Sequence, residues 1–148
     1  KRGDFLTHNK DKNILSLMKV TDIIETDFKI ISPDATLGEL VKLIPQTNRN
    51  IFAVIDNEQD FVGIVTLDDV RKIMFMPEIY ETTKIADIMY IPSITINIDD
   101  NMETIAQKFH NSNKFNIVVL KDGKYLGFVS RANLFSSYRK MLKHFSDD

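Results

Sequence analysis

The chain has 148 residues, of which 43% are hydrophobic and 27% charged, and its formal net charge at pH 7 is −2. This composition is typical of a soluble globular protein, and the charge argues against a basic surface that binds nucleic acid. The chain contains no cysteine, which excludes disulfides, thiolate metal sites and cysteine nucleophiles. We expect neither a signal peptide nor a transmembrane helix, because Lys1 leads into a polar stretch and no apolar run approaches roughly 18 residues.

The first half of the chain alternates short helical and extended segments. Helices are indicated by apolar residues at helical spacing, and strands by short apolar runs. Helices are expected at 13–18, 20–24, 37–44 and 67–75, and strands at 29–32, 51–55 and 61–66. Pro45 ends the third of these helices, and Thr66 stands at the N-cap position of the fourth.

The second half follows the same order after a linker at 77–83. Helices are expected at 84–89, 102–109 and 131–145, and strands at 94–97, 116–120 and 125–130. Asp122-Gly123 predicts a tight hairpin turn, because such a turn needs a positive φ that glycine adopts easily. Ser130 stands at the N-cap position of the last helix, whose apolar stripe suits a core or an interface.

The two halves are copies of one unit. The segment 20–24 matches 85–89 at a shift of 65 residues, and Gly63-Ile64-Val65-Thr66 matches Gly127-Phe128-Val129-Ser130 at a shift of 64. The division that follows is an N-terminal linker and helix at 1–19, repeats at 20–76 and 84–148, and a linker at 77–83. A unit of this size cannot cover its own sheet. We therefore expect an α/β (α+β) protein of two βαββα repeats, packed sheet to sheet with pseudo-twofold symmetry.

Catalytic chemistry is not indicated by the sequence. The three histidines lie far apart without carboxylate partners, and the glycines form no phosphate-binding loop. Asp56, Glu58 and Asp60 have the spacing of calcium-loop ligands, but Phe61 and Leu67 occupy the places of the required glycine and glutamate. This acidic segment is therefore predicted to be a hairpin turn. We expect no catalytic residue, no metal site and no enzymatic activity.

One motif recurs: glycine, two apolar residues, a hydroxyl residue, and a polar residue three positions later. It spans Gly63 to Asp69 and Gly127 to Asn133. On its own, Thr66 with Asp69 can form a capping box that needs no ligand. In its duplicated frame, however, the chain resembles a tandem CBS-domain pair, or Bateman module, over about residues 20–142. That resemblance implies a regulatory adenine nucleotide (AMP, ADP or ATP) as ligand, with no required cofactor.

The resemblance also implies two sites, in which the hydroxyl residue faces phosphate and the acidic residue binds ribose. One site would use Thr66 and Asp69, with Ser93, Ile94, Phe115 and Asn116 around the base. The other would use Ser130, Arg131 and Asn133, with Lys29, Ile30, Arg49 and Asn50. Asn133 lacks the charge of the family aspartate, whereas Arg49 and Arg131 suit a polyphosphate. We expect AMP at the Asp69 site, weak or no binding at the other, and stronger binding there after Asn133→Asp.

A second resemblance concerns both ends of the chain. The segments KRGDFLTHNKDK (1–12) and SRANLFSSYRK (130–140) resemble the cytoplasmic tails of bacterial CLC-family chloride channel proteins. This implies a regulatory tail on the cytoplasmic face of the inner membrane, partnered by the membrane transport domain of the same polypeptide. It also implies a homodimer, for which the stripe at 135–145 is a candidate interface. Two alternatives are a ligand-free dimerisation module and the CBS pair of another host, such as a divalent-cation efflux protein.

Overall fold

The computed structural model describes residues 9–146, which fall into two compact units. Unit 1 contains the described parts of Lys1–Thr26, Ile94–Lys121 and Leu126–Asp148, and unit 2 contains Asp27–Ser93 and Asp122–Tyr125. Each unit therefore takes segments from both sequence repeats. Residues 1–8, which carry much of the N-terminal resemblance to CLC tails, lie outside the described residues.

Unit 2 is built on a three-stranded sheet in the order β1-β2-β3. The strands are β1 (Ile30–Ile31), β2 (Ile51–Ile55) and β3 (Phe61–Thr66). β1 runs parallel to β2, with Ile31 opposite Val54, and β2 runs antiparallel to β3. All five side chains of β2 are buried, and β2 is the central strand of this sheet.

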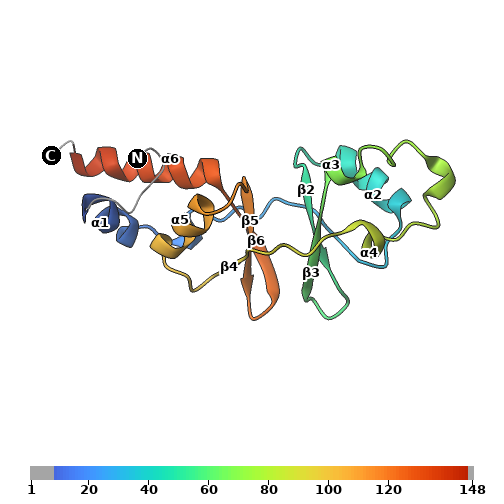
Figure 1. Ribbon diagram of the computed structural model, residues 1–148, viewed down its shortest axis with the longest axis horizontal. Coiled ribbons are helices and arrows are strands. Elements are labelled where there is room, and N and C mark those ends of the chain that lie inside the picture. Colours follow the sequence, from blue (N-terminus) through green and yellow to red (C-terminus); the bar gives the residue numbers. More distant parts are fainter. Residues whose placement is uncertain (1–8, 147–148) are drawn as a thin grey trace. The chain divides into compact units, whose positions relative to one another are not determined.

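The helices of unit 2 lie on one side of this sheet in Figure 1. They are α2 (Leu37–Leu43), α3 (Leu67–Val70) and α4 (Ile85–Ile88), with 3-10 turns η2 (Ile44–Gln46) and η3 (Pro77–Ile79). Their apolar faces join Phe52, Val54 and Val65 of the sheet in a buried cluster. Burial of these side chains positions β3, in which the motif begins at Gly63.

The helix expected at 67–75 is shorter than its sequence pattern suggests. α3 ends at Val70, and the chain continues in turns to Phe75, whose side chain is 78% exposed. The hydroxyl of Tyr80 donates a hydrogen bond to the carbonyl of Met74, which holds the turns against the following segment. The expected linker at 77–83 lies within unit 2, and the amide of Leu37 donates to the carbonyl of Thr83 at 2.8 Å.

Unit 1 contains the second three-stranded sheet, in the order β4-β5-β6. Its strands are β4 (Ile96–Asn97), β5 (Asn116–Lys121) and β6 (Lys124–Ser130), with β4 parallel to β5. The tip of the β5–β6 hairpin, Asp122–Tyr125, belongs to unit 2. The helices α1 (Asn9–Leu17), α5 (Met102–His110) and α6 (Arg131–Ser146) lie on one side of this sheet (Figure 1), and η1 (Val20–Asp22) follows α1.

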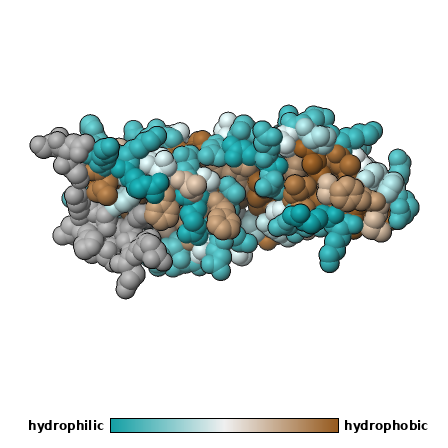
Figure 2. Space-filling model, turned by 90° about the horizontal axis from the view of Figure 1, so that it is seen from above, coloured by the Kyte–Doolittle hydropathy of each residue, from teal (hydrophilic) through white to brown (hydrophobic). Residues whose placement is uncertain are grey.

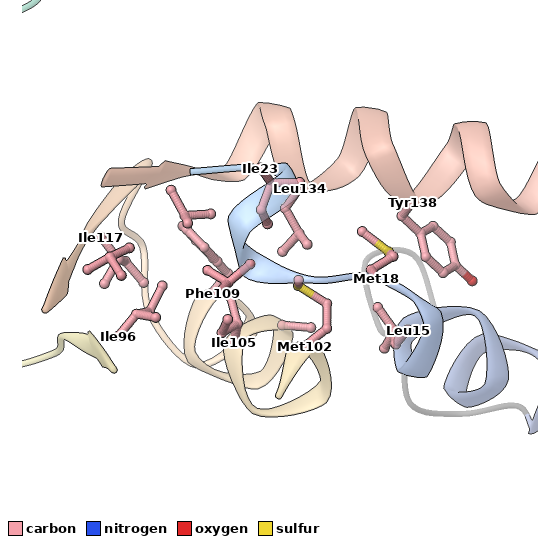
Figure 3. Close-up of a cluster of buried hydrophobic side chains, with 14 of the residues drawn as sticks. Leu15, Met18, Ile23, Ile96, Met102, Ile105, Phe109, Ile117, Leu134 and Tyr138 are labelled. Carbon is pink, nitrogen blue, oxygen red and sulfur yellow. The ribbon is translucent and has the colours of Figure 1, made fainter. Parts of the chain in front are cut away.

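The core of unit 1 explains the apolar stripe of α6. Leu134 and Tyr138 point toward Leu15, Met18 and the side chains of α5 (Figure 3) and are buried. Phe135, Met141 and Leu142 are partly buried against the same cluster. Phe145 remains 43% exposed. Most of the predicted interface stripe therefore packs inside unit 1, and the homodimer stays a prediction.

An exchange of segments between the repeats accounts for the composition of the two units. Glu25 pairs with Phe128 of β6, and Tyr90 pairs with Ile64 of β3, each through two backbone hydrogen bonds of 2.8–3.0 Å. The two pairs are equivalent, because Glu25 and Tyr90 differ by 65 positions and Ile64 and Phe128 by 64. Each repeat thus contributes one residue to the sheet of the other.

This exchange also explains why the motif begins with glycine. A Cβ on Gly127 would lie 2.5 Å from the carbonyl oxygen of Glu25, and one on Gly63 would lie 3.0 Å from that of Tyr90. The first distance is shorter than real Cβ contacts, and the second lies at their lower limit. A side chain at Gly127 would therefore push against the backbone of Glu25, and one at Gly63 against the backbone of Tyr90. The motif glycines therefore permit the close backbone approach.

The described surface is mixed in character. Figure 2 shows hydrophilic side chains interrupted by hydrophobic ones. The most exposed large apolar side chains are Phe75, Ile91 and Phe115, at 75–79%. No helix in the range 9–146 is both long and apolar enough to span a membrane. The predicted fold class, two α/β repeats with a three-stranded sheet each, is confirmed, and the sheet-to-sheet packing stays a prediction.

Candidate nucleotide-binding site

Thr66 and Asp69 form a capping box where β3 passes into α3. The Thr66 hydroxyl accepts a hydrogen bond from the Asp69 amide at 3.1 Å, and Asp69 Oδ2 accepts one from the Thr66 amide at 3.2 Å. Asp69 is exposed, and its Oδ1 makes no hydrogen bond within the described part of the chain. The box fixes the carboxylate in place and leaves one oxygen available to an external donor. We call this pair the Thr66 site.

Tyr90 is a further residue of this site that the sequence did not reveal. It lies directly opposite Ile64, and paired residues on neighbouring strands project to the same face. Thr66, two positions along β3, shares that face. The Tyr90 side chain is half-buried, and burial together with the Asp69 charge raises its pKa. The sequence signal was weak, because Tyr90 reaches β3 only through the exchange of segments.

Ser130 and Asn133, which we call the Ser130 site, are the equivalent pair in unit 1 but bond differently. The Ser130 hydroxyl accepts from the Asn133 amide at 2.9 Å, as in a helix cap. The side chain of Asn133 does not return to the Ser130 amide. Its Nδ2 instead donates to the carbonyl of Ile23 at 2.9 Å. Asn133 therefore holds the exchanged segment, a role that needs a donor and that a carboxylate cannot fill.

Arg131 is engaged with backbone carbonyls in the last turn of α5 and just after it. Its Nη2 donates to Phe109 at 2.7 Å and to Ser112 at 2.9 Å, and its Nε donates to Lys114 at 3.1 Å. The guanidinium carbon also lies 5.5 Å from the centroid of the Phe109 ring. Three of the five guanidinium N–H donors, those on Nε and Nη2, are therefore engaged with the backbone rather than turned to phosphate, the role expected from the sequence.

Arg49 is likewise paired within unit 2. Its Nη2 lies 2.5 Å from Asp27 Oδ1 and its Nε 3.3 Å from Oδ2, and its guanidinium sits 4.3 Å from the centroid of Phe28. The hydrogen bond from Arg49 holds the pKa of Asp27 below its ordinary value. Burial, with a smaller contribution from the Asp27 charge, raises the pKa of the neighbouring Tyr125 to about 12. The positive charge of Arg49 is therefore balanced locally.

The remaining predicted site residues are divided between the units. Ser93, Lys29, Ile30 and Asn50 belong to unit 2, where the Asn50 carbonyl accepts from the amide of Leu67 at 2.8 Å. Ile94, Phe115 and Asn116 belong to unit 1, where the Phe115 carbonyl accepts from the amide of Arg131 at 2.8 Å. Grouping of these residues around one nucleotide stays a prediction.

The acidic turn between β2 and β3 is bonded internally. Asp56, Glu58 and Asp60 each offer a ligand oxygen, and these atoms lie within 4.8 Å of one another. The ammonium group of Lys124 donates to Asp60 Oδ1 at 2.6 Å and to the Glu58 carbonyl at 2.9 Å. Asp56 Oδ1 accepts from the amides of Glu58 and Asp60. The positive charge beside this acidic turn is thus the ammonium group of Lys124.

Three solved structures share the fold. A CbpB structure in complex with c-di-AMP matches with a TM-score of 0.75 and 17% identity, covering 93% of this chain and 95% of that chain. CBSX2 in complex with AMP matches with a TM-score of 0.69 and 19% identity, covering 84% and 98%. The CBS domain of a bacterial CNNM/CorC family Mg²⁺ transporter matches with a TM-score of 0.72 and 17% identity, covering 86% and 78%.

Sequence comparisons point to the same module. A homoserine O-acetyltransferase of Methanococcus vannielii is 31% identical over 121 residues, which are 81% of this chain but 25% of that protein. The chain thus spans about a quarter of the length of this relative. The family model of the CBS domain matches residues 20–75 and 85–140, once in each repeat. The chain therefore belongs to the CBS domain family, as a tandem pair.

Proposed function

We propose that this CBS pair is a regulatory module that binds an adenine nucleotide through the Thr66 site. The observation that carries the proposal is the Asp69 carboxylate, fixed by its capping box and exposed, with Oδ1 available. A fixed carboxylate makes strong, charge-assisted hydrogen bonds with donors such as the ribose hydroxyls. The AMP and c-di-AMP complexes of structurally similar proteins support this choice of ligand class.

The Ser130 site is proposed to bind nucleotide weakly or not at all. Asn133 donates one side-chain N–H and Arg131 donates three of its five to backbone carbonyls of unit 1. A nucleotide that took up these donors would break those bonds, and a buried carbonyl left without a donor is costly. We therefore expect one nucleotide per chain.

We further propose that the pair is the cytosolic sensor of a membrane transporter and is not itself an enzyme. The resemblance of residues 130–140 to CLC tails supports a chloride channel or chloride/proton exchanger as host, on the cytoplasmic face of the inner membrane and as a homodimer. The similar fold in a CNNM/CorC transporter supports a divalent-cation transporter as the second candidate. In either host, nucleotide can bias the transport domain only through different affinities for its conformational states.

Isothermal titration calorimetry of the wild-type chain and Asp69→Asn with AMP, ADP, ATP and c-di-AMP tests nucleotide binding. Asparagine keeps an oxygen acceptor for the Thr66 amide, so the cap is retained while the charge is lost. We expect Asp69→Asn to weaken binding about tenfold, as for loss of a charged hydrogen-bond partner. Asp68→Asn is the matched control, because Asp68 is exposed on the same helix and pairs with Arg71. Equal affinity of wild type and Asp69→Asn would overturn the proposal.

A ligand-free dimerisation module remains the alternative, because the Thr66–Asp69 capping box is complete without a ligand. On this account none of the four nucleotides gives heat, and sedimentation velocity finds a dimer. Binding by the wild-type chain excludes it.

A further inference from the structure

The exchanged residues Tyr90 and Glu25 occupy equivalent positions in the two units but differ in chemistry. Tyr90 is bonded to Ile64 through amide and carbonyl, at 2.9 and 2.8 Å, and Glu25 is bonded to Phe128 in the same way, at 2.8 and 3.0 Å. Both side chains are half-buried. One unit thus presents a phenol where the other presents a carboxylate.

The strand register places each of these side chains beside its motif. A residue directly opposite another on an antiparallel pair shares its face, and diagonal neighbours remain within reach of long side chains. Tyr90 therefore shares a face with Ile64 and Thr66, and Glu25 shares one with Phe128 and Ser130. The effect of Asp69 on the pKa of Tyr90 agrees with this proximity.

The two side chains have opposite consequences for a nucleotide. A neutral aromatic ring stacks on a base, and every base offers a π-face. The base is joined directly to the ribose, so a ring next to a ribose-binding carboxylate is well placed to meet it. A carboxylate beside the Ser130 hydroxyl instead repels phosphate. In the Ser130 motif, the guanidinium of Arg131 is bonded to the carbonyls of Phe109, Ser112 and Lys114.

We propose that this exchanged position decides which site accepts nucleotide: Tyr90 contacts the base at the Thr66 site, and Glu25 excludes phosphate from the Ser130 site. The inference rests on the proposed function and adds to it the residues that set its specificity. It assigns a ligand-contacting role to a residue outside the recurring motif.

The test for Tyr90 is calorimetry with AMP on wild type, Tyr90→Leu and Tyr90→Phe. The leucine variant removes the ring and should bind about tenfold more weakly, within the range measured for loss of base stacking. Phenylalanine keeps the ring and should bind like wild type. The chain has no tryptophan, so tyrosine emission gives a second readout, and AMP should change it in wild type but not in Tyr90→Leu. Unchanged affinity of Tyr90→Leu would overturn the role of Tyr90.

The test for Glu25 is the stoichiometry of ATP binding by Glu25→Gln. Glutamine is nearly isosteric, and the backbone bonds of residue 25 are kept. A second, weaker site that is absent from wild type should appear, and its affinity should fall as salt rises. A stoichiometry still at one would overturn the role of Glu25. If Asp69→Asn weakens AMP binding while Tyr90→Leu does not, this inference fails and the proposed function stands. If wild type binds no nucleotide, both fail.

Discussion

The substitution Asn133→Asp tests how the second motif is used. In the structure, Asn133 Nδ2 donates to the carbonyl of Ile23 across a partly buried contact of 2.9 Å. Aspartate would replace this donor with an anionic oxygen facing the carbonyl oxygen. The lost bond and the unsatisfied carbonyl together cost about 1–3 kcal/mol. At about 2–4 °C per kcal/mol for a chain of this size, the melting temperature at neutral pH should fall by about 2–12 °C.

The pH dependence of this effect distinguishes a lost donor from general damage. The folded state disfavours the introduced charge, so the pKa of the new carboxyl is raised on folding. The destabilisation is therefore present above that pKa and is relieved as the pH falls through it, because the protonated carboxyl can again donate. Asn133→Ala lacks the donor at every pH and serves as the control.

Thermal melts followed by circular dichroism between pH 4 and pH 8 measure both effects, because relief occurs between the raised pKa and the ordinary pKa of an aspartate, about 3.9. A melting temperature of Asn133→Asp equal to that of wild type at pH 8 would refute the assigned hydrogen bond. So would a difference that does not shrink on acidification. The sequence predicts stronger nucleotide binding after Asn133→Asp, and the hydrogen bond to Ile23 adds the expectation of a less stable fold.

Three further predictions concern the contacts that frame the sites. Arg131→Met should lower the free energy of unfolding in urea by about 2–3 kcal/mol, because three carbonyls lose a charged donor. A free energy of unfolding equal to that of wild type would contradict a stabilising role of these hydrogen bonds. Gly127→Ala should lower the melting temperature more than Gly63→Ala, since its Cβ meets backbone at 2.5 Å whereas that of Gly63 meets the flexible Met89 sulfur at 2.9 Å; the reverse order would be inconsistent with the close approach of Glu25. Burial raises the pKa of Asp100, but the Lys108 hydrogen bond, the Asn97 amide and the Lys108 charge together hold it below its ordinary value. The stability gained from Asp100 is therefore present above its ordinary pKa and lost as pH falls through the lowered one, so acid unfolding of Lys108→Met should begin at higher pH than in wild type; identical acid transitions would argue against this pair.

Much of the fold follows from local sequence patterns. The apolar runs at 51–55 and 61–66 correspond to β2 and β3. The repeat shift of 64–65 residues relates the pair of Glu25 with Phe128 to the pair of Tyr90 with Ile64. The Thr66–Asp69 capping box was also foreseeable, because both partners lie within four residues. In each case the interacting residues are close in sequence or part of a regular period.

The features that the sequence did not reveal depend on long-range contacts. The acceptors of Arg131 lie 17–22 residues earlier, in the last turn of α5 and just after it, and the acceptor of Asn133 lies 110 residues earlier. Tyr90 reaches β3 only because segments are exchanged between the repeats. Such contacts have no periodic signature along the chain.

Binding of an adenine nucleotide at the Thr66 site can be observed directly by amide chemical-shift mapping with AMP in NMR. The Thr66 and Asp69 amides are the two donors of the capping box, so a ligand at Asp69 must change their surroundings. We expect AMP to shift the amide resonances of Thr66, Asp69 and Tyr90 in a saturable manner and to leave those of Ser130 and Asn133 in place. Unchanged amides at Thr66 and Asp69, or saturable shifts confined to Ser130 and Asn133, would contradict it.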